Sequence, residues 1–167
     1  MTGRDEAPCA GRRRAGVASS ARDAALSGGS YAITGGLGGL GLRAATLLVE
    51  CGAARVLLAS RSGLVPRDGR GFAARLRPST CVTASDVGDA QDARPLLSCA
   101  LHVGVLHAAG VLRDQMLRSM AADALDASFA PKALGASHLR AIETCTPLEA
   151  LGLFSSVAST FGNIGQA

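Results

Sequence analysis

Short apolar runs alternate with amphipathic stretches along the chain from residue 31 onward. The apolar runs predict five strands, at residues 31–34, 55–60, 81–86, 103–108 and 151–156. Helical spacing predicts one helix after the first strand, a short one at about 71–77, and two more over about 90–101 and 121–143. This alternation predicts an α/β, Rossmann-like doubly wound fold, in which helices cover both faces of a parallel sheet. Right-handed crossovers then predict the strand order 3-2-1-4-5.

The helical stretches carry predicted buried faces and end signals. The first helix has apolar residues on one face at Leu40, Ala44, Leu47, Leu48 and Cys51. Gly52 follows, where a helix commonly ends on glycine. In the long stretch, Ser119 is a candidate N-cap, and Pro131 is expected to kink or split the helix. The predicted buried stripe of this stretch consists of Leu125, Phe129, Leu139 and Ile142.

The composition favours one packed domain without a metal. Apolar residues make up 48% of the 167 positions and charged residues 18%, which fits a globular core rather than a disordered chain. No stretch approaches the roughly 18 consecutive apolar residues of a transmembrane helix. The five cysteines lie far apart without a C-x-x-C pair, and no cluster of His, Cys or carboxylates offers metal ligands. We therefore expect a cytoplasmic protein with reduced cysteines and no membrane partner.

The first part of the chain differs from the rest. Residues 1–27 show no hydrophobic period and are expected to form a disordered leader ahead of one domain at 28–167. The leader has an arginine triplet at 12–14, in a chain of formal net charge +4. Acidic residues stand in the same segment, so a solvated tail is favoured over a contact with nucleic acid or a membrane. Its alanine, serine and arginine content leaves an organellar targeting signal open.

A glycine-rich segment joins the first predicted strand to the first predicted helix. It consists of Thr34, Gly35, Gly36, Leu37, Gly38, Gly39, Leu40 and Gly41. The segment satisfies both G-x-G-x-x-G and T-G-x-x-x-G-x-G. Glycines here let the backbone approach a pyrophosphate, while the positive end of the helix is directed at its charge. The segment therefore predicts a dinucleotide-binding loop.

The ends of the second and third predicted strands indicate which dinucleotide is bound. The second strand ends in Ser60 and is followed by Arg61, where an acidic residue would bind the ribose 2′-hydroxyl of NAD. A basic residue there suits the 2′-phosphate of NADP, and a guanidinium matches phosphate geometry. We therefore predict NADP(H) as the cofactor. Asp86 and Val87, at the end of the third strand, are candidate cofactor contacts; Asp86 either accepts a hydrogen bond from the adenine amino group or caps the next helix.

Five segments, taken together, resemble one protein family. They are Y-A-I-T-G-G-L-G-G-L-G, L-L-A-S-R-S-G, V-L-H-A-A-G-V-L-R-D, A-P-K-A-L-G-A-S-H-L and L-F-S-S-V-A-S-T-F-G-N-I-G-Q-A. Their order and spacing over about residues 29–167 resemble the ketoreductase domains of polyketide synthases and animal-type fatty acid synthases, within the short-chain dehydrogenase/reductase superfamily. The resemblance implies NADPH-dependent reduction of a β-ketoacyl chain on a carrier protein to a β-hydroxyacyl thioester. It also implies neighbouring synthase domains as partners.

The resemblance implies roles for individual residues. Lys132 corresponds to the family's lysine, which supports a proton-donating tyrosine, and it is the only lysine in the chain. Ser156 corresponds to the serine that holds the carbonyl oxygen, and Ser155 is expected on the cofactor side. The family's cofactor-contacting turn corresponds to His107, Ala108, Ala109 and Gly110. Within that turn, His107 is expected to pack rather than to catalyse.

The sequence departs from the family pattern in two places. The family's tyrosine is expected just beyond Ala167, and Tyr31, the only tyrosine, belongs to the first strand. We therefore expect a sheet incomplete at its C-terminal side and a chain that is inactive alone. Arg113 stands where many members have an Asp that marks product configuration, so the configuration stays open. Two alternatives also stay open: a non-catalytic NADP-binding module that needs a partner chain, and a short-chain dehydrogenase acting on a free small carbonyl.

Overall fold

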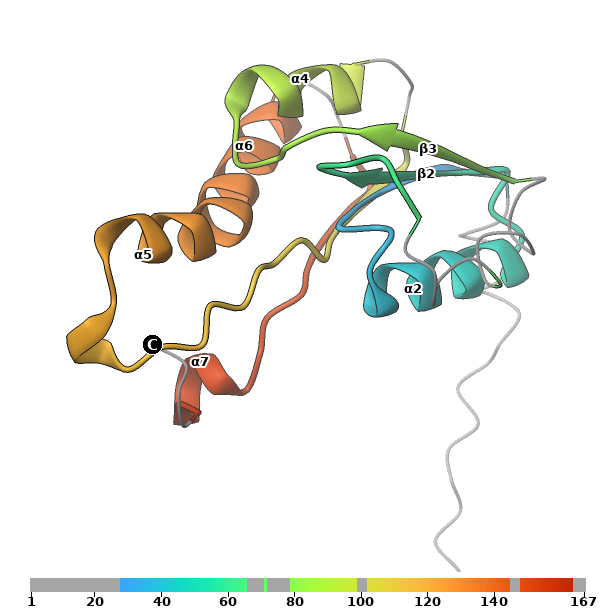
Figure 1. Cartoon of the computed structure of the whole chain (residues 1–167). Helices are drawn as coiled ribbons and strands as arrows, with labels where there is room; N and C mark the ends of the chain where they lie inside the picture. Colours follow the sequence, from blue (N-terminus) through green and yellow to red (C-terminus); the bar gives the residue numbers. More distant parts are fainter. Residues whose placement is uncertain (1–27, 66–70, 72–78, 99–101, 145–147, 164–167) are drawn as a thin grey trace, which may run out of the picture.

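A computed structural model describes residues 28–65, 71, 79–98, 102–144 and 148–163. The strands form one parallel sheet in the order β3-β2-β1-β4-β5 (Figure 1), which confirms the predicted fold class and strand order. They are β1 (Ser30–Thr34), β2 (Arg55–Ser60), β3 (Thr80–Ala84), β4 (Gly104–His107) and β5 (Ala150–Leu153). β3 and β5 end earlier than predicted, because the residues after them leave the ladder and form loops at the carboxyl edge of the sheet.

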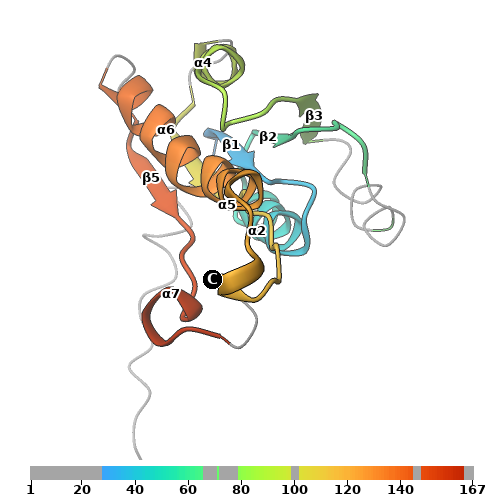
Figure 2. The same cartoon turned by 60° about the vertical axis from the view of Figure 1, so that its left-hand side comes forward.

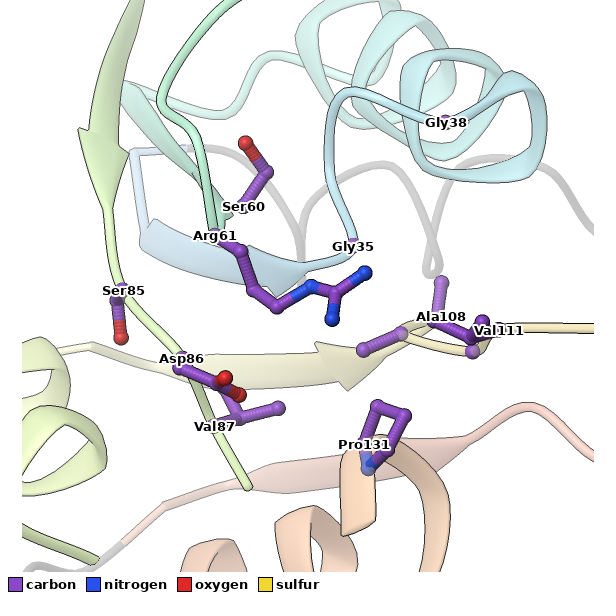
Figure 3. A pocket seen from close by; sticks show the side chains of 12 residues that line it. Gly35, Gly38, Ser60, Arg61, Ser85, Asp86, Val87, Ala108, Val111 and Pro131 are labelled. Carbon is purple, nitrogen blue, oxygen red and sulfur yellow. The ribbon is translucent and has the colours of Figure 1, made fainter. Parts of the chain in front are cut away.

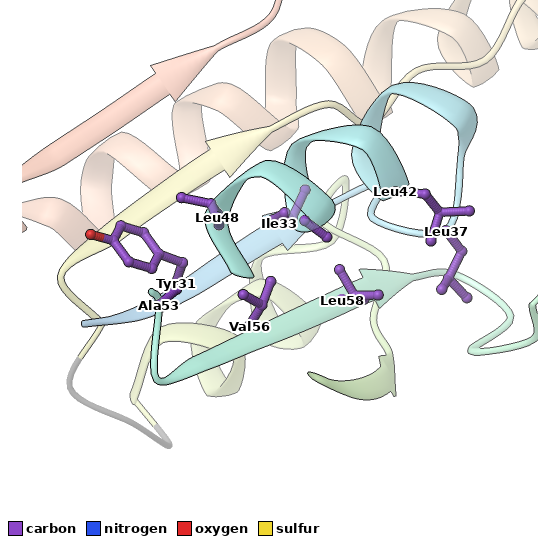
Figure 4. Close-up of a cluster of buried hydrophobic side chains, with 9 residues drawn as sticks. Tyr31, Ile33, Leu37, Leu42, Leu48, Ala53, Val56 and Leu58 are labelled. Atoms are coloured by element: carbon purple, nitrogen blue, oxygen red, sulfur yellow. The ribbon is translucent and has the colours of Figure 1, made fainter. Parts of the chain in front are cut away.

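Helices cover both faces of the sheet. α2 (Gly39–Glu50) packs on one face, whereas α4 (Ala90–Ser98) and α6 (Gly135–Glu143) lie side by side on the other (Figures 1 and 2). The core under α2 (Figure 4) consists of Tyr31, Ile33, Leu37, Leu42, Ala45, Leu48, Ala53, Val56 and Leu58. The core under α4 and α6 consists of Ala32, Ala59, Val87, Leu96, Val105 and Leu139. Successive residues of β1 alternate between these cores, as a strand buried on both faces requires.

The buried face of α2 differs from the predicted one. Leu40 and Leu47 are 51% and 60% exposed. Leu48 is buried as predicted, and the other buried residues of α2 are Gly41, Leu42 and Ala45, none of which was predicted. The glycine loop sets this rotation, because a Cβ on Gly41 would lie 2.6 Å from the Gly35 carbonyl oxygen. Because only glycine fits this close approach, α2 is oriented with Gly41 toward the loop backbone. Hydrophobic spacing alone therefore does not predict the buried face of α2 correctly.

Pro131 divides the long predicted helix, as expected. α5 (Ala122–Phe129) and α6 are joined by a π-helical turn, Ala130–Leu134. Proline has no N–H to continue the α-helical ladder, and its ring crowds the preceding turn, so the backbone widens at this point. The π-helical turn carries Lys132 between the two helices.

The predicted buried stripe of the long helix holds only for its second half. Leu139 is fully buried, and Ile142 packs against the core. α5 lies beyond the carboxyl ends of the strands and has no buried residue (Figure 1). Leu125 and Phe129 are therefore 51% and 55% exposed, and their predicted burial is wrong.

The helix-end signals give one confirmed and one wrong prediction. Gly52 has φ +89°, and the N–H groups of Gly52 and Ala53 bond back to carbonyls in the last turn of α2, the Schellman arrangement. Ser119 does not cap α5, because its hydroxyl donates to the Met116 carbonyl within a short 3₁₀ turn. Ala121 precedes α5 without a side-chain cap. The predicted helix at 71–77 lies outside the described residues apart from residue 71, as does the predicted leader at 1–27.

Candidate functional site

A pocket of about 210 Å³ lies at the carboxyl edge of the sheet, around the ends of β1, β2 and β4. In open α/β sheets ligands bind at this edge, where the strand order reverses, here between β1 and β4. Predicted cofactor residues that line the pocket are Gly35, Gly38, Ser60, Arg61, Asp86, Val87, Ala108, Ala109 and Gly110. Ser85, Val111 and Pro131 also line the pocket and were not predicted from the sequence. Their position next to predicted residues was the only signal that pointed to them.

Close contact between backbone segments explains three glycines of the loop. Gly35 has φ +67°, and a Cβ there would lie 2.6 Å from backbone atoms of Ala108. A Cβ on Gly36 would lie 2.7 Å from the Ile33 carbonyl oxygen, and Gly41 meets the loop as closely. These glycines therefore allow β1, the start of α2 and the turn after β4 to meet at the pocket.

Two other glycines lie at the exposed start of α2. Gly38 and Gly39 are exposed, and a Cβ on Gly39 would meet no atom within 4 Å. Gly38 is the N-cap of α2 and has no side chain to cap the helix, and the first turn of α2 has no acidic residue. A helix N-terminus carries unpaired N–H groups and a partial positive charge. This end of α2 therefore fits a phosphate group.

Arg61 follows β2 and has an exposed side chain. Figure 3 shows it reaching across the pocket, with Gly35 on one side and Asp86 and Val87 on the other. The Ser60 hydroxyl accepts a hydrogen bond from the Gly63 N–H at 3.1 Å, which shapes the turn after Arg61. Among the described residues Arg61 has no ion-pair partner, so its guanidinium is available to an anionic ligand.

Asp86 does not cap α4, one of its two predicted roles. Its Oδ1 accepts the Gly88 N–H at 2.9 Å and closes a turn before the helix. Asp89 is the cap instead, because its Oδ1 accepts the N–H groups of Gln91 and Asp92 at 2.7 and 3.1 Å. Asp86 itself lines the pocket, which leaves the predicted adenine contact as its candidate role.

His107 lies beneath the pocket rather than in its lining. Its side chain is buried, and its Nδ1 lies 2.6 Å from the Oγ1 of Thr34, which is also buried. Nε2 lies 3.2 Å from the carbonyl oxygen of Lys132. Burial lowers the pKa of His107, while hydrogen bonds to the carbonyls of Lys132 and Pro131 act in the opposite direction. Of the predicted cofactor-contacting turn, Ala108, Ala109 and Gly110 therefore line the pocket and His107 does not.

Lys132 lies next to the turn that follows β4. A Cβ on Gly110 would lie 2.9 Å from Lys132 Cε and 3.8 Å from its Cγ, so the aliphatic part of the lysine rests against this glycine. The side chain is exposed, whereas the neighbouring Pro131 is buried and lines the pocket. The structure thus brings the only lysine of the chain to the border of the pocket.

Ser155 and Ser156 follow β5 at the same edge of the sheet. The Phe154 N–H donates to the His107 carbonyl at 3.0 Å, which keeps the ends of β4 and β5 together. Ser156 Oγ accepts the Ala158 N–H at 3.2 Å, at the start of α7 (Ala158–Phe161). Ser155 Oγ lies 3.4 Å from Ser159 Oγ. Both serines are exposed and stand outside the pocket lining.

Tyr31 cannot serve this site. It is buried near the start of β1, at the opposite edge of the sheet. Burial raises the pKa of the Tyr31 hydroxyl, with a further increase from Glu149, and the hydroxyl has no partner among the described residues. The same residues hold no group of three or more His, Cys, Asp or Glu that could bind a metal. They also include no helix long and apolar enough to span a bilayer.

A strand, glycine loop and helix in a sheet of this order define a Rossmann-like nucleotide-binding domain. The family model described as the KR domain matches residues 29–167, so the chain belongs to the KR domain family. Its relatives are polyketide synthases, and the solved structures similar to it include ketoreductases of those synthases. The predicted resemblance is confirmed.

Individual comparisons show how much of each protein is shared. The chain is 40% identical over 157 residues to the 6-methylsalicylic acid synthase of Arthrobotrys oligospora, covering 83% of this chain and 9% of that protein. It is 39% identical over 146 residues to a phenolphthiocerol/phthiocerol polyketide synthase of Mycobacterium tuberculosis, covering 84% and 8%. A solved structure of A-type ketoreductases from a modular polyketide synthase superposes with a TM-score of 0.76 at 34% identity, over 84% of this chain and 31% of that one. The chain therefore spans under a tenth of these synthases and about a third of that ketoreductase.

The family and its fold imply a nicotinamide cofactor, and the pocket residues fit one. Within the described part of the chain, the start of α2 has no side-chain cap, and it has room for a phosphate, since a Cβ on Gly39 would meet no atom within 4 Å. Arg61, which also lines the pocket, offers a second anion-binding group (Figure 3). Small residues, Ala108, Ala109 and Gly110, line the pocket as well. These features suit an elongated ligand with phosphates.

Proposed function

We propose that this chain forms the NADP(H)-binding part of a ketoreductase domain in a polyketide or fatty acid synthase. The domain would reduce the β-keto group of an acyl chain on a carrier protein to a β-hydroxyl group. The carrying observation is that the glycine loop, Arg61 and the Gly110 turn line one pocket, with Lys132 resting against that turn. The small share of each multidomain synthase that the chain matches supports neighbouring synthase domains as partners.

Each wall of the pocket has a proposed partner on the cofactor. The first turn of α2 and the exposed glycines, Gly38 and Gly39, would hold the pyrophosphate. Arg61 would bind the 2′-phosphate that distinguishes NADP from NAD. The Asp86 carboxylate would accept a hydrogen bond from the adenine amino group. The turn with Gly110 would pack against the nicotinamide ribose.

The catalytic residues would act on the carbonyl oxygen of the substrate. NADPH, when bound, supplies a hydride to the carbonyl carbon. The Ser156 hydroxyl accepts a bond from the Ala158 N–H, so its own hydrogen is available to the substrate oxygen. The Lys132 ammonium would stabilise negative charge near that oxygen and favour proton donation by a neighbouring tyrosine, the family's donor. Hydride on carbon and a proton on oxygen give the hydroxyl product.

Isothermal titration of the chain with NADPH and with NADH tests the cofactor. We expect NADPH to bind more tightly by about ten- to hundredfold, because one charge-assisted hydrogen bond contributes roughly 1.5–3 kcal/mol. Arg61→Ala should abolish this preference without changing NADH affinity. Arg140→Ala removes an exposed arginine of α6 and serves as the matched control. Equal affinities for the two cofactors, or an unchanged ratio in Arg61→Ala, would contradict the assignment.

The reaction is tested on the ketoreductase domain that contains this sequence. NADPH oxidation is followed with a β-ketoacyl thioester as substrate. Lys132→Ala and Ser156→Ala should each lower kcat by roughly 10²–10⁴, the usual contribution of positioned proton-transfer and charge-stabilising groups. Wild-type turnover in both variants would exclude the proposed roles.

A further inference from the structure

His107 connects two segments that the proposed function uses for different tasks. Thr34, to which Nδ1 is bonded, is the last residue of β1 and the first of the glycine loop. Lys132, whose carbonyl accepts from Nε2, lies in the π-helical turn between α5 and α6. These partners are 73 and 25 positions away from His107 in the sequence. One buried ring thus ties the start of the cofactor loop to the backbone of Lys132.

The bonding partners fix the tautomer of this ring. A carbonyl oxygen only accepts hydrogen bonds, so Nε2 must carry the hydrogen that points to Lys132. Nδ1 of a neutral imidazole is then an acceptor, and the Thr34 hydroxyl must donate to it. Burial lowers the pKa of His107, which keeps the ring neutral at pH 7. Each hydrogen in this chain of bonds therefore has one defined direction.

The His107 ring packs closely against Gly135, next to the π-helical turn that carries Lys132. A Cβ on Gly135 would lie 3.0 Å from His107 Cε1, tighter than ordinary contact. The Gly135 N–H is shared between the carbonyls of Ala130 and Lys132. His107 supplies a second donor to that carbonyl. The side chain of the same lysine rests against Gly110, three residues after His107.

We propose that His107 is a positioning residue, which holds the π-helical turn so that the Lys132 side chain lies over Gly110 and toward the cofactor. This inference rests on the proposed function, because it assigns Lys132 a place beside a bound cofactor. His107 itself touches neither substrate nor cofactor. It acts through the backbone of Lys132, and Thr34 orients the ring from the other side.

A second histidine provides a built-in control. His102 is equally buried, and its Nδ1 and Nε2 lie 3.2 Å from the Ser30 hydroxyl and 3.2 Å from the Leu96 carbonyl. This is the same bonding pattern at the other edge of the sheet, away from Lys132. Replacing either ring by Phe removes both hydrogen bonds and keeps an aromatic ring of similar shape. Only the His107 variant should disturb Lys132.

The experiment uses the single lysine as a spectroscopic probe. Reductive methylation with ¹³C-formaldehyde gives one lysine resonance, separate from that of the α-amino group, because Lys132 is the only lysine. In the wild-type chain, saturating NADP⁺ is expected to shift this resonance. His107→Phe should lose the shift, whereas His102→Phe should keep it even if the two variants melt at equally lowered temperatures. Thr34→Val, which retains the bond to Lys132 but frees the ring on its other side, should reduce the shift if His107→Phe does not fold.

Rescue by amide side chains separates positioning from packing. The amide nitrogen of Gln reaches about as far from the backbone as Nε2, whereas that of Asn is one methylene shorter. His107→Gln should therefore restore the NADP⁺-dependent shift, and His107→Asn should not. A full shift in folded His107→Phe, or an equal loss in His102→Phe, would overturn the positioning role. Absence of any shift in the wild-type chain would instead contradict the proposed cofactor site, and the inference with it.

Discussion

The two edges of the parallel sheet are held by the same chemical device. At the amino edge, His102 bridges Ser30, the first residue of β1, and the Leu96 carbonyl of α4. At the carboxyl edge, His107 bridges the last residue of β1 and the turn that carries Lys132. Both rings are buried, and both use Nδ1 toward a hydroxyl and Nε2 toward a carbonyl. The local chemistry of the two bridges is therefore nearly identical.

The two bridges differ in what surrounds the groups that His102 and His107 bond. Leu96 belongs to the core under α4, so the bridge of His102 fastens a helix to the sheet. The turn bonded by His107 has Pro131 in the pocket wall and Lys132 at its border. Parallel sheets place their ligand sites at the carboxyl ends of strands. A buried histidine bridge is thus no sign of function by itself; its position relative to that edge decides what it does.

Substitutions of the glycines that flank β1 should give the largest difference in stability between the two edges of the sheet. Gly28 precedes the strand and Gly35 follows it, and both have positive φ, +79° and +67°. A Cβ on Gly28 would meet nothing within 4 Å, whereas one on Gly35 would lie 2.6 Å from the Ala108 backbone. Gly28→Ala should cost about 1–2 kcal/mol through backbone strain alone. Gly35→Ala should cost about 3 kcal/mol or more, because strain and overpacking add.

Urea denaturation of both variants measures these free energies of unfolding. The pair is matched in residue change and in sign of φ, so the difference reports the packing of backbone on backbone at the carboxyl edge. Equal losses in the two variants would mean that the loop relaxes freely. In that case the close approach of the Gly35 and Ala108 segments would not be a requirement of the fold.

The order of strands was predictable because hydrophobic runs and right-handed crossovers leave few arrangements. The rotation of each helix about its own axis, which decides the face that it buries, was less predictable. Leu40 and Leu47 belong to a regular apolar stripe, yet the steric demand of Gly41 turns α2 away from it. The burial predicted for Leu125 and Phe129 was wrong for another reason: α5 lies beyond the sheet (Figure 1), and none of its residues is buried. Periodicity predicts that a helix forms, but not what it packs against.

The site was predictable where a motif dictates chemistry. The glycine loop, Arg61 and the small residues after β4 meet in one pocket, as their positions at strand ends suggested. Contacts that depend on folded geometry were not predictable. Nothing in the sequence distinguishes Asp86 from Asp89 as the cap of α4, or shows that His107 bonds the backbone of Lys132. Such bonds join residues far apart in the chain, so only the three-dimensional structure reveals them.

Acid should weaken each bridge, and the loss per ring should be smaller than the loss expected for Gly35→Ala. Burial lowers the pKa of His102, opposed by its bond to the Leu96 carbonyl and assisted by Arg55, and burial lowers that of His107. Unfolded histidines take up protons near pH 6.5, whereas the buried rings resist. The unfolded state then binds more protons, so stability is full above pH 6.5 and falls below it, by at most about 1.4 kcal/mol per pH unit for each ring.

Unfolding free energies between about pH 8 and 5 test this titration. His102→Gln and His107→Gln should each reduce the dependence on pH, and the double variant should reduce it most. An unchanged dependence in the double variant would assign the acid effect to carboxylates instead. The comparison of the two single variants shows which bridge is the more sensitive to acid.

Gly39→Ala should cause the smallest change in stability of these variants. It also separates a glycine needed for the fold from one needed for the ligand. It opens α2, and a Cβ there would meet no protein atom within 4 Å. Gly39→Ala should therefore stabilise the chain slightly, by up to about 1 kcal/mol, since alanine favours helix more than glycine does. The same methyl group would stand where the proposed pyrophosphate lies against the first turn. NADPH affinity should consequently fall roughly tenfold, the equivalent of 1.4 kcal/mol.

Calorimetric titration of this variant, beside its urea denaturation, gives both quantities. Gly28→Ala is the control at the other edge of the sheet and should lose stability while keeping its affinity for NADPH. Opposite signs in the two variants would show that the glycine before β1 serves the fold and that the glycine at α2 serves the ligand. Unchanged affinity in Gly39→Ala would place the phosphates away from the start of α2. The pocket would then have to hold its ligand through Arg61 and the turn after β4, which line its other walls.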